Sequence, residues 1–466
     1  MAVVIKPAAA WMSEFVAIAT PPTAARDRAA QALCDTVGVM LAGAVEPAAM
    51  IARSAFDSGA NNTCRILGRP ERAGAGDAAL ANGVAAHALD YDDMCFVSLA
   101  HPSCALVPAV LAAGELVGAS GRSVLDGYVV GFEIECRLGA VMNPRHYHER
   151  GWHCTSSIGT VGAAAAASRV LGLDGSATAH AIGIAASAAC GLKENIGAMV
   201  KPLHAGLAAR NGIMAARLAQ AGFTASERAI DGPQGYLAAM DSQQPPSALA
   251  EAIGDLGSRW EILDTGITVK LYPSCAATHP PLDILLELVR RHRIADDDIL
   301  AIDVEVDSMT PRLLIHECPA TGLEAKFSMP FCAAAAAVFG PPGVDTFDVS
   351  HIRDSRVQRL MPLVTLRANA TFDDAQPLSQ ACVSVRLRDG RTVSARVDGA
   401  RGYPGRLTDE ELHAKFLACA QRSLDQRAAT AALAAVRAIE RADDIRSITS
   451  AFTPERDANQ LLSKHP

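Results

Sequence analysis

The chain has 466 residues and a formal net charge of −8, and its composition is 50% hydrophobic but only 5% aromatic. Its length exceeds what one hydrophobic core usually supports, so we expect two domains. Acidic and basic residues are interspersed without the basic stripe that binds a phosphate backbone, which argues against nucleic acid as a partner. No window approaches the ~18 apolar residues of a membrane span, and the N-terminal segment lacks the unbroken apolar core of a signal peptide.

Twelve cysteines are scattered singly through the chain, and none belongs to a CxxC pair. Several stand in apolar runs, where a free thiol behaves as a small hydrophobic side chain. This usage favours a cytoplasmic protein in a reducing environment over a secreted, disulfide-bonded one.

The first half of the sequence predicts helices. Apolar residues recur at helical spacing in the segments 24–43, 78–87, 106–117, 123–138, 156–171 and 175–190. Gly172 and Gly191 follow the last two segments, and glycine commonly ends a helix. We expect no strand before about Gly222.

After Trp260 the pattern becomes mixed. We predict strands at 299–306 and 363–370, a hairpin of 382–387 and 392–397 around Asp389-Gly390, and helices at 281–292 and 329–338. Thr408 and Glu411 have the spacing of a capping box that opens another helix, and a last helix is expected at 430–442.

These elements predict a mainly α protein with two domains. A large helical domain would hold residues 1–265, completed by 405–466, and a smaller α+β domain would hold 266–404. In the alternative arrangement, the last helices cover the sheet of the second domain.

One segment, from Ala88 to Glu115, places acids and an imidazole between apolar stretches. It contains Asp90, Asp92 and Asp93, followed by His101. Buried carboxylates need partners or changed pKa values, so the segment is a candidate functional site. In the alternative interpretation, Asp90 and Asp93 cap the following helix and His101 is an ordinary core residue.

Two lysines stand among uncharged residues. Lys201 precedes Pro202 in GAMVKPLHAG, and Lys270 is followed by Pro273 in TVKLYPSC. A lysine in an apolar setting beside a turn fixed by proline is a candidate anion-binding group or a general base with a lowered pKa. Alternatively, each lysine extends along apolar surface to reach water.

The segment RGWHCTSSIG adds Arg150 and His153 just before a helix of small residues, whose N-terminal amides can bind an anion. Two lysines, an arginine and two histidines suit a pocket for a polycarboxylate. The matching chemistry is proton abstraction next to a carboxylate, with cationic groups that stabilise the enolate-like charge. One histidine or lysine would act as base and a second group as acid.

Other chemistries have little support. The sequence has no GxxxxGK[ST] and no GxSxG, and the glycine pair at Gly159 and Gly162 lacks a preceding strand. His146, His148 and His153 lie close together, but no HExxH or Cys/His frame accompanies them, so we expect no metal.

Six segments carry a family resemblance. LDYDD, HPS, GWHCT, KPLHAGLAARNG, KLYPSCAATHP and EAKFSMPFCAAAA occur in this order. The set resembles the MmgE/PrpD family, whose members include 2-methylcitrate dehydratases, cis-aconitate decarboxylases and iminodisuccinate epimerases, and the resemblance covers about residues 10–450. It implies a large all-helical domain, a smaller α+β lid domain, an active site in the cleft between them, a homodimer, and no metal or organic cofactor.

The resemblance also assigns roles by motif. It places the catalytic histidines at His101 and His153, the acid that opens LDYDD at Asp90, and the two lysines at Lys201 and Lys270. Together with the residue chemistry, it predicts two sets: catalytic His101, His153, Asp90 and Lys201, and substrate-binding Lys270, Asp93, Arg150 and Cys275. Asp93 is also expected to hold a neighbouring helix terminus.

Two positions depart from the pattern that decarboxylase members are expected to carry. Met94 stands in place of a threonine and Cys275 in place of a histidine. These departures weaken the case for cis-aconitate as substrate. Because loss of water is the commonest outcome in the family, we expect a dehydratase-type lyase acting on a small di- or tricarboxylic acid, with an epimerase or a decarboxylase as alternatives. A catalytically silent helical protein that binds a carboxylate is the alternative outside enzymes.

Overall fold

The computed structural model describes residues 6–55, 63–240, 246–373 and 379–454, and the chain forms two compact units. Unit 1 comprises Met1–Ala88, Asp92–Ile267 and Thr408–Pro466, and unit 2 comprises Leu89–Tyr91 and Thr268–Leu407. The predicted C-terminal completion of the helical domain extends to residue 466, and its last part, 455–466, lies outside the described residues.

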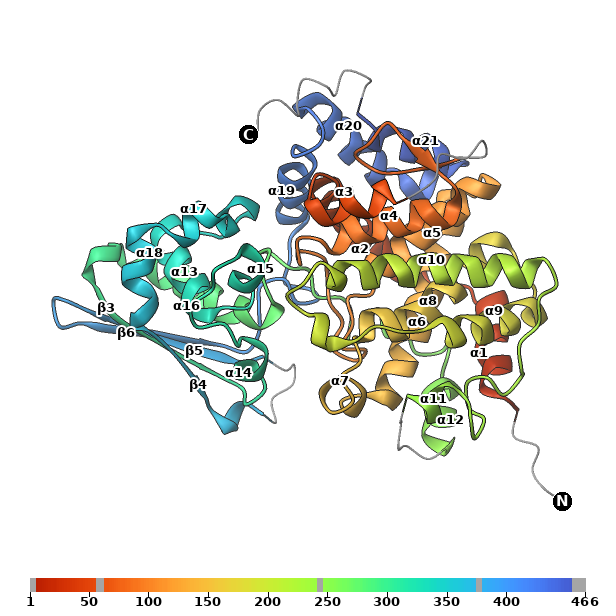
Figure 1. The fold of residues 1–466 in the computed structure, drawn as a ribbon, viewed down its shortest axis with the longest axis horizontal. Helices are drawn as coiled ribbons and strands as arrows, with labels where there is room; N and C mark the ends of the chain where they lie inside the picture. Colours follow the sequence, from red (N-terminus) through yellow and green to blue (C-terminus); the bar gives the residue numbers. More distant parts are fainter. Residues whose placement is uncertain (1–5, 56–62, 241–245, 374–378, 455–466) are drawn as a thin grey trace. The chain divides into compact units, whose positions relative to one another are not determined.

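Unit 1 is built from helices, which confirms the mainly helical prediction (Figure 1). They are α1 (Ala8–Ile18), α2 (Thr23–Gly43), α3 (Pro47–Ser54), α4 (Ala75–His87), α5 (Ser103–Val117), α6 (Gly121–Met142), α7 (Arg145–His148), α8 (Cys154–Leu171), α9 (Gly175–Ala188), α10 (Val200–Gln220), α11 (Tyr236–Ala239), α12 (Pro246–Gly254), α19 (Asp409–Ala420), α20 (Gln426–Arg437) and α21 (Ile445–Thr449).

Small residues allow these helices to pack closely. A Cβ atom added at Gly83 of α4 would lie 2.7 Å from Cα of Gly206 in α10, and one added at Gly206 would lie 2.5 Å from the Leu80 carbonyl oxygen. Real side chains do not fit at such distances, so α4 and α10 pack backbone to backbone. One of these helices, α10, carries the candidate site residue Lys201.

Three expectations for unit 1 were wrong in part. A short strand pair, β1 (Cys64–Arg65) with β2 (Arg72–Ala73), occurs where no strand was predicted, because two residues per strand give no periodic signal. The segment predicted as the last helix corresponds to α20, which begins at Gln426 after the N-cap Asp425 and is followed by α21. Pro202 lies in the first turn of α10 rather than in a proline-fixed turn, a position that tolerates proline.

Unit 2 contains a four-stranded sheet in the order β4-β3-β5-β6. Its strands are β3 (Ile299–Val306), β4 (Val364–Ala368), β5 (Ala381–Leu387) and β6 (Thr392–Val397), and its helices are α13 (His279–His292), α14 (Thr310–Leu313), α15 (Gly322–Ala325), α16 (Met329–Phe339), α17 (Val349–Ile352) and α18 (Ser355–Leu360). β3 pairs in parallel with β4 and antiparallel with β5, and β5 and β6 form the predicted hairpin.

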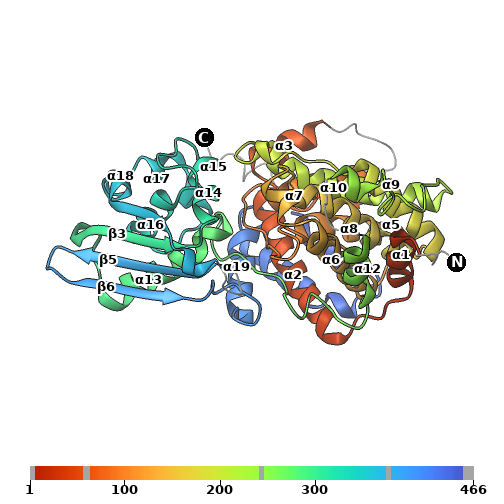
Figure 2. The same cartoon turned by 90° about the horizontal axis from the view of Figure 1, so that it is seen from below.

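Helices cover one face of this sheet, as Figures 1 and 2 show. Buried residues alternate along β5, where Val383 and Val385 belong to the core and Arg386 is exposed. This alternation is typical of a sheet with one buried face. The predicted strands and helices of this part of the chain are confirmed, with bounds that differ by a few residues.

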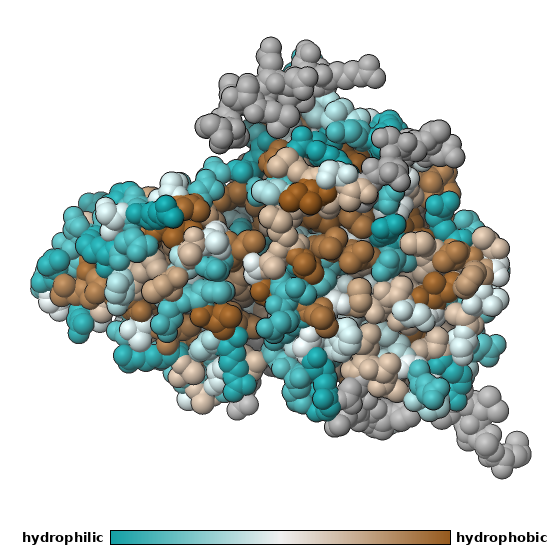
Figure 3. Space-filling model, in the orientation of Figure 1, coloured by the Kyte–Doolittle hydropathy of each residue, from teal (hydrophilic) through white to brown (hydrophobic). Residues whose placement is uncertain are grey.

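The surface of unit 1 exposes apolar side chains along α10. Met199, Val200, Met214 and Leu218 are at least 36% exposed, and Figure 3 shows hydrophobic residues interspersed with hydrophilic ones on this side. Within the described ranges, no individual helix has both the length and the hydropathy that a bilayer crossing requires. Only α2 and α3 taken together, with an 80° bend, meet those limits.

Candidate active site

Asp92 lies between two imidazoles in unit 1. Its Oδ2 atom is 2.7 Å from Nδ1 of His87 and 3.5 Å from Nδ1 of His101. The side chains of Asp92 and His87 are fully buried, whereas 15% of the His101 side chain is exposed. A carboxylate in such a position fixes the orientation and tautomer of an imidazole. His101 is therefore held by a buried carboxylate, and part of its side chain is exposed to solvent.

The backbone explains how these side chains meet. His87 ends α4, and the chain then runs without a helix until α5 begins at Ser103. The backbone N–H of His101 donates to Oγ1 of Thr155 in α8, at 3.0 Å. His101 is thus fixed at the start of α5 and against the start of α8.

His87 contacts both of the predicted catalytic histidines. Its ring centroid lies 4.6 Å from that of His101 in an edge-on arrangement and 5.7 Å from that of His153 in a stacked one. His87 was not among the predicted site residues. The structure nevertheless brings His101 and His153 to the same place, with His87 in contact with both rings.

His153 forms a second imidazole pair with His204, another residue that the sequence analysis did not select. Their Nδ1 atoms are 3.0 Å apart, so one ring donates and the other accepts. Burial, reinforced by the Lys201 ammonium and the neighbouring histidines, holds the pKa of His153 well below its usual value. Burial and positive neighbours lower the pKa of His204 to about 4. Both rings are therefore neutral at physiological pH.

Three helices begin at this group of side chains. His101 lies two residues before α5, His153 is the N-cap of α8, and Lys201 is the second residue of α10. The N-terminus of a helix carries a partial positive charge and unsatisfied N–H groups that favour anions. The 6% exposed Lys201 adds a full positive charge. The site is thus electrostatically suited to a carboxylate.

Asp93 is buried beside the start of α5. Its Oδ1 atom accepts from the backbone N–H of Ser103 at 3.3 Å, and the Ser103 hydroxyl lies between Oδ2 and the Tyr128 hydroxyl, 2.6 Å from the latter. Burial raises the pKa of Asp93 well above its usual value, although the Ser103 hydrogen bonds oppose this shift. The expectation that Asp93 holds a helix terminus is confirmed. Its contact with substrate stays a prediction.

Asp90 and Lys270 lie in unit 2 and contact each other. The Lys270 ammonium is 3.2 Å from Oδ2 of Asp90 and donates to its carbonyl oxygen at 2.8 Å. Lys326 similarly donates to the carbonyl oxygens of Leu89 and Pro273. Only 1% of Lys270 and 5% of Lys326 is exposed. The capping alternative for Asp90 is thus replaced by an ion pair, and the predicted roles of Asp90 in catalysis and Lys270 in substrate binding stay predictions.

The remaining predicted residues lie in less buried positions. Arg150 is exposed after α7, and Cys275 of unit 2 is partly buried, with its backbone N–H donating to the Lys326 carbonyl oxygen at 3.0 Å. Met94 is partly buried in the segment between Asp93 and His101. The predicted role of Arg150 in substrate binding stays a prediction.

The structure does not bring together His146, His148 and His153, the three histidines that the sequence suggested as possible metal ligands. Among the described residues, the groups with ligand spacing do not include His146, His148 or His153, and His146 instead contacts the Ser157 hydroxyl at 2.7 Å. The ligand atoms of His87, Asp92 and His101 do lie within 4.8 Å of one another. However, the 2.7 Å between Nδ1 of His87 and Oδ2 of Asp92 is a hydrogen-bond length, whereas two ligands on tetrahedral zinc are about 3.3 Å apart.

Both halves of the chain match models of one family. Residues 8–249 match the MmgE/PrpD N-terminal domain, and residues 272–441 match the MmgE/PrpD C-terminal domain.

Three similar proteins are named as cis-aconitate decarboxylases or as like them. The chain is 28% identical over 466 residues to a cis-aconitate decarboxylase-like protein of Aspergillus oryzae, which covers 96% of each chain. It is 29% identical over 383 residues to the cis-aconitate decarboxylase of Homo sapiens, covering 80% of this chain and 78% of that one. It is 27% identical over 384 residues to the cis-aconitate decarboxylase of Aspergillus terreus, covering 78% of each.

Proposed function

Because this chain belongs to the MmgE/PrpD family, we propose that it is a lyase that acts on a small di- or tricarboxylic acid. The reaction moves a proton at a carbon next to a carboxylate. The observation that carries this proposal is the group formed in unit 1 by His87, Asp92, His101 and His153, with Lys201 close enough to lower the pKa of His153.

Positive charge at the site would bind the substrate. The N-termini of α5, α8 and α10 and the Lys201 ammonium all favour a carboxylate. The same groups stabilise the negative charge that develops on the substrate when a carbon–hydrogen bond breaks. A donor set of this kind lowers the energy of the transition state more than that of the bound acid, which is what catalysis requires.

The imidazoles would move the protons. His153 is neutral in the free protein, so its ring has a lone pair that can accept a proton from carbon. A bound polycarboxylate adds negative charge beside the ring and offsets the effect of Lys201, which favours the protonated form once the substrate is in place. His101, oriented by Asp92 and partly exposed, is the second proton-transfer group.

Three outcomes of the reaction are candidates: loss of water, loss of CO₂ and epimerisation. Loss of water is the outcome that the sequence analysis favoured, and the names of the relatives support loss of CO₂ from cis-aconitate. Met94 and Cys275 differ from the residues expected in decarboxylases. We therefore propose a lyase of the dehydratase or decarboxylase type, with epimerisation as the alternative.

Proton NMR in D₂O tests the proposal directly. The purified chain is incubated with cis-aconitate, citrate, 2-methylcitrate and iminodisuccinate, and deuterium uptake, product signals and released CO₂ are recorded. We expect exchange of a proton next to a carboxylate in at least one acid, and the product identifies the outcome. Thermal stabilisation by these acids without exchange or product would instead indicate a carboxylate-binding protein.

We also propose that the reaction needs no metal. Dialysis against EDTA should leave turnover unchanged within twofold, because the family resemblance implies an enzyme without a metal. Loss of activity that added Zn²⁺ restores would contradict this expectation and assign a metal to His87, Asp92 and His101.

The predicted homodimer and cytoplasmic location belong to the same proposal. The apolar side chains exposed along α10 support a protein contact on unit 1, since exposed apolar patches often mark such contacts. Light scattering coupled to size exclusion measures the molar mass, and twice the chain mass of 48.6 kDa is the expected result.

A further inference from the structure

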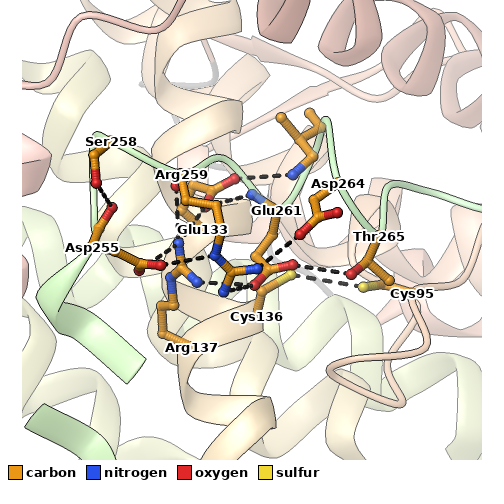
Figure 4. A network of polar contacts seen from close by, with 11 residues as sticks. Cys95, Glu133, Cys136, Arg137, Asp255, Ser258, Arg259, Glu261, Asp264 and Thr265 are labelled. Carbon is orange, nitrogen blue, oxygen red and sulfur yellow. Dashed lines mark hydrogen bonds and ion pairs between the residues drawn. The ribbon is translucent and has the colours of Figure 1, made fainter. Parts of the chain in front are cut away.

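Two buried sulfur atoms lie beside the candidate active site. Sγ of Cys95 and Sγ of Cys136 are 3.7 Å apart, and neither residue has exposed surface. Figure 4 shows the pair next to the polar network in which Glu133 and Arg137 of α6 hold the segment from Asp255 to Thr265. Cys136 belongs to the rigid α6, whereas Cys95 belongs to the segment from Asp92 to His101, which we call the site loop.

The environments of the two thiols differ. Hydrogen bonding with Cys136, together with hydrogen bonds from Ser98 and Val97, lowers the pKa of Cys95, and burial opposes this shift. Burial, followed by the contact with Cys95, raises the pKa of Cys136 well above its usual value. Two thiols in contact, one with a lowered and one with a raised pKa, are the arrangement in which one sulfur reacts with an oxidant and the other resolves the product.

The site loop connects this sulfur pair to the imidazoles. The backbone N–H of Cys95 donates to the carbonyl oxygen of Ala100 at 3.0 Å, directly before His101. Asp92, which holds His87 and His101, lies three residues before Cys95. A covalent bond to α6 would therefore act on both ends of the loop.

The size of the displacement follows from the two distances. A disulfide needs a separation of about 2.0 Å, so the sulfurs must close from 3.7 Å by about 1.7 Å. The loop has little room to slide as a whole, because a Cβ atom added at Gly139 of α6 would already lie 2.4 Å from Cα of Ser98, and Asn143 binds the Ser98 carbonyl oxygen at 2.7 Å. Rotation of the two side chains supplies part of the movement, and because Ser98 is held, the rest falls on the loop at Cys95.

We propose that Cys95 and Cys136 form a reversible disulfide under peroxide and that this bond switches the enzyme off by displacing the site loop. The Cys95 sulfur attacks one peroxide oxygen and loses its proton, and the O–O bond breaks. The leaving hydroxide takes that proton as water, and Cys95 becomes a sulfenic acid. The Cys136 sulfur then attacks the Cys95 sulfur, the S–O bond breaks, and the leaving hydroxide takes the Cys136 proton as water. Two thiols are oxidised and one peroxide is reduced to two waters.

Mass spectrometry tests the bond without reference to activity. The full chain is incubated with hydrogen peroxide, free thiols are alkylated under denaturing conditions, and unreduced digests are searched for a peptide that links Cys95 to Cys136. We expect this link to form with a mass loss of two hydrogens and to disappear after treatment with dithiothreitol. Peroxide exposure that yields no such peptide overturns the proposal.

A second experiment measures turnover. It therefore rests on the proposed function, and it uses two variants. Oxidation should lower turnover of the unmodified chain at least tenfold, since misplacement of catalytic groups by about 1 Å has effects of this order or larger, and dithiothreitol should restore it. Cys136→Ser cannot form the bond and should lose much less turnover under the same peroxide dose than the unmodified chain, and Cys136→Ala provides a second version if serine disturbs the core.

Cys34→Ser is the matched control, because Cys34 is a buried thiol on another helix, α2. It should behave as the unmodified chain does. Equal and equally reversible inhibition of the Cys136→Ser variant would overturn the switch. If the proposed reaction is itself wrong, the linked peptide should still form, so the two failures are distinguishable.

Discussion

The imidazoles of His101 and His153 would carry the proton transfers, so their removal is the first test. We expect His101→Ala and His153→Ala each to lower turnover by about 10² or more, because a positioned general acid or base contributes that much. Initial rates on the acid identified by NMR provide the measurement. His413→Ala on α19 is the control, with an expected change below twofold, and full activity in both site variants would contradict the assignment.

His146 gives a prediction for pH and stability. Burial lowers its pKa to about 4 from the usual 6.5. Because the folded-state pKa is depressed, the unfolded chain binds more protons below pH 6.5, and stability is lost as the pH falls from there toward 4. Between pH 7 and pH 5, the free energy of unfolding should therefore fall by about 2 kcal/mol less in His146→Gln than in the unmodified chain.

Urea unfolding at the two pH values measures this difference, and glutamine keeps an amide that can contact Ser157. His413→Gln, with a partly buried ring on α19, should show the same pH dependence as the unmodified chain. If the unfolding free energy of the His146 variant fell as much as that of the unmodified chain, folding would not keep this ring neutral.

The site residues were predictable from the sequence only in part. Motifs placed His101, His153 and Lys201, and the structure brings these three together. His204 was within a quoted motif but was not selected, because Pro202 was interpreted as a turn. In the helix that actually forms, Lys201 and His204 are three residues apart and therefore neighbours on one face. His87 lies at a helix end whose direction depends on packing, and no local pattern reveals that.

Close packing of α4 on α10 makes Gly206 a critical position. A methyl group there would lie 2.5 Å from the Leu80 carbonyl oxygen and 2.7 Å from Val84, and a helix backbone cannot yield as a side chain can. Gly206→Ala should cost about 1–3 kcal/mol of stability, as overpacking does, and should also lower activity because α10 carries Lys201 and His204.

Gly76→Ala is the control within the same helix pair. The nearest atom to its added methyl group is Cγ of Arg210, at 3.6 Å, and alanine is the better helix former by roughly 0.5–1 kcal/mol. Thermal unfolding should thus give opposite signs for the two variants. A Gly206 variant as stable as the unmodified chain would mean that α4 and α10 can separate at little cost.

Helices and strands with a clear period were predicted well, and short elements were not. The hairpin β5–β6 was found because the alternation and the Asp389-Gly390 turn agree, and the capping box at Thr408 and Glu411 is present. The start of α20 was missed because its N-cap, Asp425, precedes a run of alanines that fits many registers. Such segments are positioned by tertiary packing rather than by local propensity.

The path of the whole chain was not predictable, because the polypeptide enters unit 2 twice. Leu89–Tyr91 belongs to unit 2 although the residues on both sides belong to unit 1. Two buried lysines hold this short segment through its carbonyl oxygens and the Asp90 carboxylate. Sequence separations of 180 and 237 residues leave no local signal for such contacts.

Asp90 should therefore be a stability residue of unit 2. Asp90→Asn leaves the buried Lys270 ammonium without its 3.2 Å counter-charge, and breaking a buried ion pair costs about 3–5 kcal/mol. The double variant Asp90→Asn with Lys270→Met removes both charges and should recover most of that loss. Asp303→Asn breaks the exposed pair with Arg367 and should cost under about 1 kcal/mol.

Hydrogen exchange of the β3 and β5 amides reports the stability of unit 2 separately from that of unit 1, which makes it the appropriate measurement for these three variants. Faster exchange in the Asp90 variant, slowed again in the double variant, would establish the ion pair as the anchor of the crossing segment. If Asp90 served the reaction alone, Asp90→Asn would lower turnover and leave exchange in the sheet unchanged.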